Sequence, residues 1–403
     1  MEWKEVRLGD IADVQTGPFG SQLHKSDYIA EGIPCIMPTN IGPHLNLVVD
    51  GIAHVSEADA NRLSRHLTEF GDIIYARRGD IEKCAYVTTN EEKWLCGTGC
   101  LKIRCKNEVN SRFIAYLLST AECKKWITGN AVGTTMLNLS KGILSNLPLI
   151  IPSLADQRRI ASILSSLDRK IELNNKINAD LEEMAQAIFK NWFVDFEPFK
   201  DGKFVNSELG MIPEGWKVGT LKDLLYLRKD SIKSTNRGKL PYLPIDTIPM
   251  HNLVATDFKS NEEAKSSLQI FEENDIIVGA MRVYFHRVIL APCRGITRTT
   301  CFVLSVKDEN NLAYSLMQCN QDEAISFAER TSKGSTMPYA VWDGGYGEYK
   351  IVIPPCDVMK SFNDLLCNFL SKMNENAIEN RTLSLLRDTL LPRLMSGEIE
   401  VPE

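Results

Sequence analysis

Residues 151–192 read IPSLADQRRIASILSSLDRKIELNNKINADLEEMAQAIFKNW, the clearest helical pattern in this 403-residue chain. From Ile160 to Trp192, apolar residues recur about every 3.5 positions, which is the period of a coiled-coil seam. A second seam of this type runs from Phe362 to Leu390, and we expect its helix to end before Pro392. Because either helix alone would expose a continuous apolar stripe to water, we expect the two helices to pack against each other in antiparallel orientation.

Four asparagines lie at matched positions of the two seams, namely Asn174, Asn178, Asn376 and Asn380. Polar residues at such positions can fix the register of a helix pair at some cost in stability. If the seam drifts there, the same side chains would face water. These asparagines are therefore candidates for residues that set the register of the helix pair.

The remainder of the chain also repeats. Asp72-Ile73-Ile74 returns as Asp275-Ile276-Ile277, and Gly133-Thr134-Thr135-Met136 returns as Gly334-Ser335-Thr336-Met337. Short β-rich runs alternate with turns in both halves. The sequence predicts an α+β fold, in which two globular α/β domains related by pseudo-twofold symmetry are separated by two long antiparallel helices that form a coiled coil. The predicted segments are a first domain at 1–152, a central helix at 153–194, a linker at 195–212, a second domain at 213–355, and a C-terminal helix and tail at 356–403.

The charge balance is mildly acidic. The chain carries 46 Lys and Arg against 52 Asp and Glu, and this balance does not mark it as a nucleic-acid binder. A pseudo-twofold protein nevertheless suits duplex DNA, provided that its basic residues cluster on one face. Between Asp275 and Asp308 there is no acid, although the stretch contains Arg282, Arg287, Arg294, Arg298 and Lys307. This stretch could equally be a solvated strand face.

Motifs of catalysis and of membrane insertion are missing from the sequence. No apolar run reaches the ~18 residues of a membrane span, the charged N-terminus is unlike a signal peptide, and the 11 cysteines form no regular framework. We therefore expect a cytoplasmic protein with reduced thiols. The sequence contains no Walker loop, dinucleotide fingerprint, His-Glu-x-x-His or Gly-x-Ser-x-Gly. The spacing of Cys96, Cys100 and Cys105 fits no common zinc site, and the six histidines are scattered. We expect no catalytic residue, metal or cofactor on this chain.

Several segments, in this order, resemble one known family. They are Trp3-x-x-Val6-x-Leu8-Gly9-Asp10-Ile11, Gly71-Asp72-Ile73-Ile74-x-x-Arg77-x-Gly79, Ser207-Glu208-Leu209-Gly210-x-Ile212-Pro213-Glu214-Gly215-Trp216 and Leu390-Leu391-Pro392-x-Leu394-Met395-Ser396-Gly397-Glu398. Together they make essentially the whole chain resemble the specificity (S) subunit of a type I restriction–modification system. The second half departs from the pattern. It has Asn274 in place of Gly71 and Ala280-Met281-Arg282 in place of Arg77-Arg78-Gly79, so we expect loop geometry to differ between the halves.

The resemblance implies a non-catalytic DNA-recognition subunit that acts in phage defence. Each target-recognition domain would read one half of a bipartite, gapped sequence in double-stranded DNA, while the helix pair sets the gap and docks two modification (methyltransferase) subunits. Those subunits would transfer a methyl group from S-adenosylmethionine to adenine N6, and in a restricting complex two restriction (endonuclease/translocase) subunits would use ATP and Mg²⁺. None of these cofactors would lie on this chain. The alternative is a coiled-coil interaction scaffold that does not read DNA.

Candidate DNA contacts follow from the chemistry of phosphates and base edges, which Lys, Arg and small polar side chains bind. In the first domain they are Ser21, Gln22, His24, Lys25, Thr39, Asn40, Arg77, Arg78, Thr134, Thr135 and Asn138. In the second domain they are Arg282, Tyr284, His286, Arg287, Arg298, Lys333, Ser335, Thr336 and Tyr339. Each charged residue could instead form an ordinary surface ion pair, and the Gly-Thr-Thr and Gly-Ser-Thr loops could be plain turns.

Overall fold

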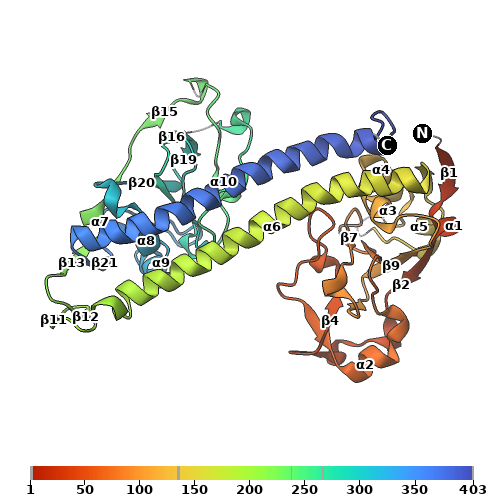
Figure 1. The fold of residues 1–403 in the computed structure, drawn as a ribbon, viewed down its shortest axis with the longest axis horizontal. Helices are drawn as coiled ribbons and strands as arrows, with labels where there is room; N and C mark the ends of the chain where they lie inside the picture. Colours follow the sequence, from red (N-terminus) through yellow and green to blue (C-terminus); the bar gives the residue numbers. More distant parts are fainter. Residues whose placement is uncertain (1–2, 134–136, 237, 266, 402–403) are drawn as a thin grey trace. The chain divides into compact units, whose positions relative to one another are not determined.

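The computed structural model describes residues 3–133, 137–236, 238–265 and 267–401 (Figure 1). The chain divides into two compact units. Unit 1 contains Met1–Arg169 together with Ser384–Glu403, and unit 2 contains Lys170–Leu383. Each unit therefore combines one α/β domain with part of both long helices.

The two long helices are α6 (Leu154–Phe193) and α10 (Cys356–Met395), each of 40 residues. Ser153 opens α6, because its hydroxyl accepts a hydrogen bond from the Asp156 amide at 3.2 Å. The prediction that the second helix ends before Pro392 is wrong, since α10 continues to Met395. Proline lies here in the last turn, where the helix loses only one hydrogen bond, and the Ser396 amide still donates to the Pro392 carbonyl at 3.0 Å.

Unit 1 is built on a four-stranded antiparallel sheet of order β2-β9-β6-β7. Strand β1 pairs with β10, and a smaller sheet has the order β3-β5-β4-β8. The strands are β1 (Lys4–Arg7), β2 (Ala12–Thr16), β3 (Tyr28–Ile29), β4 (Ile33–Ile36), β5 (Ala53–Val55), β6 (Ile73–Ala76), β7 (Cys84–Tyr86), β8 (Leu95–Cys96), β9 (Cys100–Cys105) and β10 (Pro148–Ile151). The helices are α1 (Leu8–Ile11), α2 (Glu57–Arg62), α3 (Ser111–Leu118), α4 (Ala121–Asn130) and α5 (Lys141–Ser145).

The core of unit 1 contains strand β6, whose residues are all buried, and helix α3, most of whose residues are buried. The side chains of Asn110, Thr120 and Ser140 accept amide hydrogen bonds at the starts of α3, α4 and α5. Such caps satisfy orphan amides and fix where each helix begins. The sheet and these helices share one core cluster with the unit 1 part of α6.

Unit 2 repeats this plan, with β14-β20-β17-β18 in the order of β2-β9-β6-β7 and β13 paired with β21 as β1 is with β10. A sheet of order β15-β16-β19 and a hairpin of β11 and β12 complete the unit. The elements are β11 (Phe204–Ser207), β12 (Gly210–Pro213), β13 (Lys217–Thr220), α7 (Leu221–Leu224), β14 (Leu225–Leu227), β15 (Ser231–Ile232), β16 (Leu268–Phe271), β17 (Ile276–Gly279), β18 (Val288–Leu290), β19 (Gly295–Arg298), β20 (Cys301–Val306), α8 (Leu312–Cys319), α9 (Asp322–Arg330) and β21 (Lys350–Ile353).

The backbone repeats even where the residues differ. Gly71 has a φ of +88° and its counterpart Asn274 a φ of +67°, while Gly79 (+76°) is matched by Arg282 (+51°). Asparagine tolerates the left-handed region better than most residues, but arginine does not. Contrary to the expectation from the substituted residues, both halves therefore keep the same left-handed turns at these two positions.

Polar contacts show that the helices run antiparallel within each unit. In unit 2, Asn376 Nδ2 donates to Asn178 Oδ1 at 2.8 Å, and Asn174 Nδ2 donates to Asn380 Oδ1 at 2.9 Å. The four predicted seam asparagines are thus buried and bonded to one another instead of facing water. In unit 1, α6 and α10 are joined by a buried ion pair between Asp168 and Arg387, with 3.1 Å between the Asp168 Oδ1 and Arg387 NH1 atoms.

None of the helices that the structure describes is both long and apolar enough to cross a lipid bilayer.

Candidate nucleic-acid interface

In unit 1, three of the predicted segments meet where strand β6 ends. Arg77 and Arg78 follow the strand directly, and the chain returns at Asn138 to form a β-bridge with Arg78. The guanidinium carbon of Arg77 lies 5.7 Å from the centre of the Phe19 ring, two residues before the candidate Ser21. The fold therefore gathers residues from positions 19, 77–78 and 138 into one place, named here the strand-end cluster.

The strand-end cluster has uncompensated polar groups. Arg77 Nε and Asn138 Oδ1 are buried and have no hydrogen-bond partner among the described residues. No described carboxylate pairs with Arg77 or Arg78. Burial, and then the charge of Arg78, lower the pKa of Arg77. Two neighbouring arginines without an anion, beside an unsatisfied amide, make a site suited to a phosphate or a base edge.

Four candidate DNA contacts lie between residues 21 and 25, and three of them are exposed. Ser21, His24 and Lys25 are exposed, whereas Gln22 is half-buried and its carbonyl accepts a hydrogen bond from Arg62 NH1 at 2.9 Å. Gly17 serves an internal contact, because a Cβ atom there would lie 2.0 Å from the Gly97 carbonyl oxygen.

The remaining candidates of the first domain differ in exposure. Thr39 is exposed, but Asn40 is buried. Its side-chain oxygen accepts from the Met37 N–H (3.0 Å), and its side-chain nitrogen donates to the Val48 carbonyl (3.1 Å). Thr134 and Thr135 lie outside the described residues. Asn40 thus supports its own turn, and its burial keeps it from an outside partner.

Unit 2 builds the equivalent of the strand-end cluster from different residues. Met281 and Lys333 each form a β-bridge with Tyr339, as Arg78 and Val132 do with Asn138. The Arg282 amide donates to the Pro338 carbonyl at 2.8 Å. The side chains of Arg282, Lys333, Ser335, Thr336 and Tyr339 are all exposed here.

Aromatic side chains stand next to this second cluster. The Tyr284 and Phe285 rings are 4.9 Å apart, and both are exposed. Exposed aromatic rings beside cations are typical of surfaces on which bases stack. Arg298, at the end of β19, is also exposed and has no ion-pair partner among the residues that the structure describes.

Two of the second-domain candidates have internal partners. Arg287 NH1 donates to the carbonyls of Ile245 (2.8 Å) and Ile248. His286 is buried, and its ring contacts Asn320 and Asp322. Arg287 ties a loop to strand β18, and His286 belongs to a different group of side chains.

That group corrects the view that the histidines are scattered. His251, His286 and Asp322 form a group of three side chains that could hold a metal ion, found among the described residues. The cysteines offer no such group there. Burial raises the pKa of Cys96 and of Cys105 to about 12, so both thiols stay protonated at neutral pH.

Comparison with known proteins shows which proteins the chain resembles. Residues 1–183 match the family described as "Type I restriction modification DNA specificity domain". The type I restriction enzyme MjaIX specificity subunit of Methanocaldococcus jannaschii is 27% identical over 100% of this chain and 94% of its own length. The HindI specificity subunit of Haemophilus influenzae is 25% identical over 99% of this chain and 100% of its own. Over its whole length the chain is therefore similar to specificity subunits of type I restriction–modification systems.

The fold of the chain matches a solved structure. The crystal structure of a type I restriction–modification S subunit from M. genitalium superposes with a TM-score of 0.61, at 16% identity, and covers 98% of this chain and 96% of that one. The predicted resemblance to this family and the predicted α+β fold class are confirmed. Both full-length relatives carry the name of a specificity subunit.

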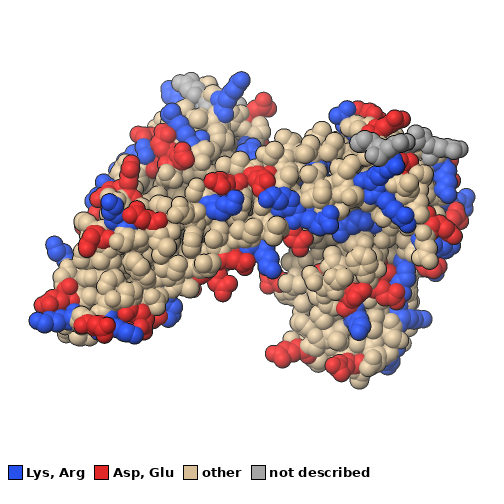
Figure 2. All heavy atoms as spheres, viewed as in Figure 1, with Lys and Arg blue, Asp and Glu red and all other residues tan. Residues whose placement is uncertain are grey.

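Some residues of the chain that suit DNA contact were missed by sequence reasoning. Phe19 and Phe285 lie under arginines, a contact that the sequence could not reveal. Figure 2 shows blue basic side chains over the unit 1 part of α6, where the helix itself carries arginines. This stretch carries exposed Arg158 and Arg169, which are eleven residues apart and therefore share one helix face. The sequence alone could therefore have predicted a basic face on this helix from the spacing of the two arginines.

Proposed function

We propose that this chain is a specificity subunit and binds double-stranded DNA through both α/β domains, each of which reads one half of a bipartite, gapped sequence. The observation that carries the proposal is the strand-end cluster of Arg77, Arg78 and Asn138, whose counterpart recurs in unit 2. Guanidinium groups without protein anions favour phosphates and guanine edges. Base contacts would select the sequence, and phosphate contacts would fix the register on the duplex.

The helix pair would set the gap between the two half-sites and dock two modification subunits. In unit 2, the outer faces of the helices expose large apolar side chains of Leu173, Met184, Leu365 and Ile378. Apolar groups on an exposed helix face mark sites for protein partners. In the assembled enzyme, S-adenosylmethionine would be held by the modification subunits for adenine-N6 methylation, and ATP and Mg²⁺ by restriction subunits where these join, all within the cytoplasm.

The test uses the chain assembled with its modification subunits. Methylome sequencing of cells that express the pair should reveal one bipartite motif, whose gap gives the half-site spacing. For binding, Arg78→Ala should weaken affinity for a duplex that contains the motif and lower the salt slope by about one unit. The matched control is Arg393→Ala, because Arg393 is exposed and already paired with Glu398 at 2.8 Å.

Two outcomes would contradict the proposal. A salt slope that Arg78→Ala and Arg393→Ala leave equally unchanged would remove the strand-end cluster from the DNA interface. A methylome without any bipartite motif, together with stable binding of the modification subunits, would favour the interaction scaffold.

A further inference from the structure

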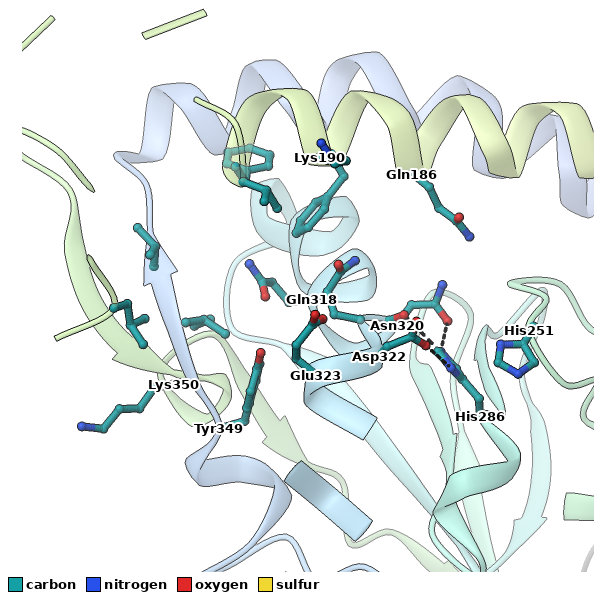
Figure 3. Close-up of a pocket in the computed structure, with 17 residues that line it drawn as sticks. Gln186, Lys190, His251, His286, Gln318, Asn320, Asp322, Glu323, Tyr349 and Lys350 are labelled. Carbon is teal, nitrogen blue, oxygen red and sulfur yellow. Dashed lines mark hydrogen bonds and ion pairs between the residues drawn. The ribbon is translucent and has the colours of Figure 1, made fainter. Parts of the chain in front are cut away.

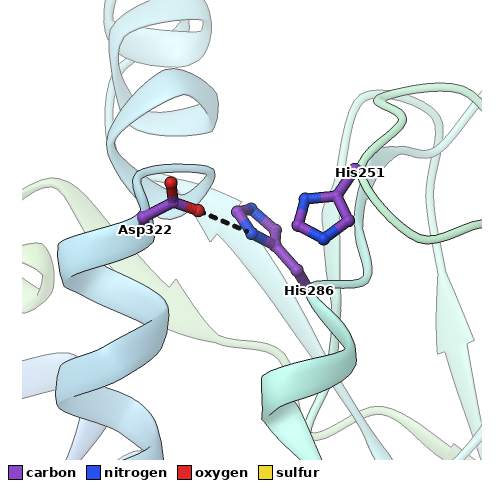
Figure 4. A group of neighbouring side chains, drawn as sticks. All are labelled: His251, His286 and Asp322. Carbon is purple, nitrogen blue, oxygen red and sulfur yellow. Dashed lines mark ion pairs between the residues drawn. The ribbon is translucent and has the colours of Figure 1, made fainter. Parts of the chain in front are cut away.

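Three side chains from separate loops converge in unit 2 (Figure 4). His251 lies in the loop after the 3₁₀ turn Ile245–Thr247, His286 follows the turn Val283–Phe285, and Asp322 is the first residue of α9. One ligand atom from each lies within 4.8 Å of the others. The His286 Nδ1 and Asp322 Oδ1 atoms are 3.1 Å apart, and the two imidazole ring centres are 4.4 Å apart.

The hydrogen bonds of His286 decide which ring nitrogen carries the proton. His286 Nε2 lies 3.0 Å from the Asn320 backbone carbonyl oxygen, which can only accept. Nε2 must therefore be the protonated nitrogen. In the neutral ring, Nδ1 then directs its lone pair at the Asp322 carboxylate. A lone pair and an anion repel each other unless a cation lies between them. Histidines that bind metals typically donate their other N–H to a carbonyl in this way.

The backbone holds the two histidines in an unfavourable conformation. His251 and His286 have φ values of +49° and +50°, and the His251 amide donates to the His286 carbonyl at 2.9 Å. Left-handed backbone is uncommon for residues other than glycine and clusters at functional sites. The hydrogen bond between the two strained residues keeps their rings side by side.

The group opens onto a cavity of about 690 Å³ (Figure 3). Polar side chains of Gln186, Gln318 and Asn320 line it together with the two histidines and Asp322. A cavity of this size holds several water molecules. An ion bound by three protein ligands would have room here for water in its open position, as zinc sites of the three-ligand type require.

We propose that His251, His286 and Asp322 bind one divalent transition-metal ion of the zinc class, with His286 ligating through Nδ1. Tetrahedral ligands at 2.0–2.1 Å from zinc lie roughly 3.3 Å apart, close to the present spacing of His286 and Asp322. Two imidazoles and one carboxylate suit zinc and its neighbours rather than magnesium or calcium. The ion joins two loops to the start of α9. The described residues of unit 1 offer no equivalent, because α4 begins with Ala121 where α9 has Asp322, so we expect one ion per chain.

The test titrates Zn²⁺ into the full chain, without an affinity tag and after removal of metals by a chelator, and records heat. Co²⁺ serves as a second probe because its visible absorption reports four-coordinate geometry. We expect one ion per chain, an affinity at least tenfold weaker in His251→Gln and in Asp322→Asn, and loss of the Co²⁺ band in both. Both replaced side chains are exposed, so these variants should fold. Zn²⁺ should also raise the melting temperature of the unmodified chain, but not that of either variant.

Two controls make the result specific. Glu323→Gln removes the neighbouring carboxylate that lines the same cavity, and His54→Gln removes a histidine on β5 of unit 1. Both should bind the ion as the unmodified chain does. Absence of stoichiometric binding, equal binding by all variants, or an equal loss in Glu323→Gln would overturn the proposal and leave His286 and Asp322 as an imidazolium–carboxylate ion pair only. Because the readout is metal binding, it is independent of DNA recognition.

Discussion

Arg228 and Asp275 form a two-point ion pair in unit 2, with Arg228 Nε 2.8 Å from Asp275 Oδ2 and Arg228 NH2 3.1 Å from Asp275 Oδ1. In unit 1 the equivalent carboxylate, Asp72, is bound by Arg104 at 2.8 Å and 2.7 Å. Both carboxylates are almost fully buried. The two halves thus keep the pair but take the arginine from different strands.

The strand registers show where the exchange occurred. Aligning β9 with β20 makes Ser305 the counterpart of Arg104, and aligning β2 with β14 makes Gln15 the counterpart of Arg228. Ser305 also donates a hydrogen bond to Asp275. A buried carboxylate needs a cation, which comes from the adjacent strand β9 in unit 1 and from the residue after β14, one strand further away, in unit 2.

This geometry predicts a rescue in unit 1. Arg104→Ser should lower the free energy of unfolding by about 2–4 kcal/mol, because Asp72 loses its cation. Adding Gln15→Arg should restore more than half of that loss, since it recreates the arrangement of unit 2. Denaturant unfolding of the four chains, including Gln15→Arg alone, measures the coupling. A double variant no more stable than Arg104→Ser would show that the registers are not interchangeable.

Backbone strain at Arg282 leads to a prediction in which stability and binding move in opposite directions. Arg282→Gly should stabilise the chain by about 1 kcal/mol, because glycine adopts the φ of +51° without steric cost. It should also weaken DNA binding and reduce the salt slope, because an exposed cation is lost. Arg282→Ala, which loses the charge and keeps the strain, should weaken binding without the gain in melting temperature. Equal melting temperatures for the glycine and alanine variants would contradict the strain argument.

Periodicity carried most of what could be predicted of the fold. The seam from Ile160 to Trp192 marked the long helix, and its matched asparagines marked the contact between helices. Loop residues were less accessible to this reasoning. His251, His286 and Asp322 are far apart in sequence and meet only because three turns converge, so no spacing could reveal them. Asn40 carries the right chemistry for a contact but points into its own turn.

The pH dependence of unit 1 should reflect His66. This side chain is buried, and desolvation, followed by the charges of Arg65 and Lys102, lowers its pKa to about 4. An unfolded histidine titrates near 6.5, so between about pH 6.5 and pH 4 the unfolded chain binds more protons than the folded one. Stability should therefore fall as the pH is lowered through this window. Melting temperatures of His66→Gln should show a flatter dependence there, and an unchanged slope would mean that other groups dominate.

The buried asparagines predict opposite effects for single and double replacement. Asn376→Ile alone should cost about 1–3 kcal/mol, because Asn178 Oδ1 loses its donor in the seam. Replacing Asn178 and Asn376 together by Ile should recover that loss or exceed it, because apolar residues then face each other. Register should loosen at the same time, since no directional contact remains at this level. Thermal unfolding gives the first effect, and faster hydrogen exchange of the α6 and α10 amides at equal or higher melting temperature gives the second. If the amides of the double variant exchange as slowly as those of the original chain, register is set by packing or by the neighbouring Asn174–Asn380 contact. If the double variant is less stable than Asn376→Ile, the amide pair itself stabilises the helices.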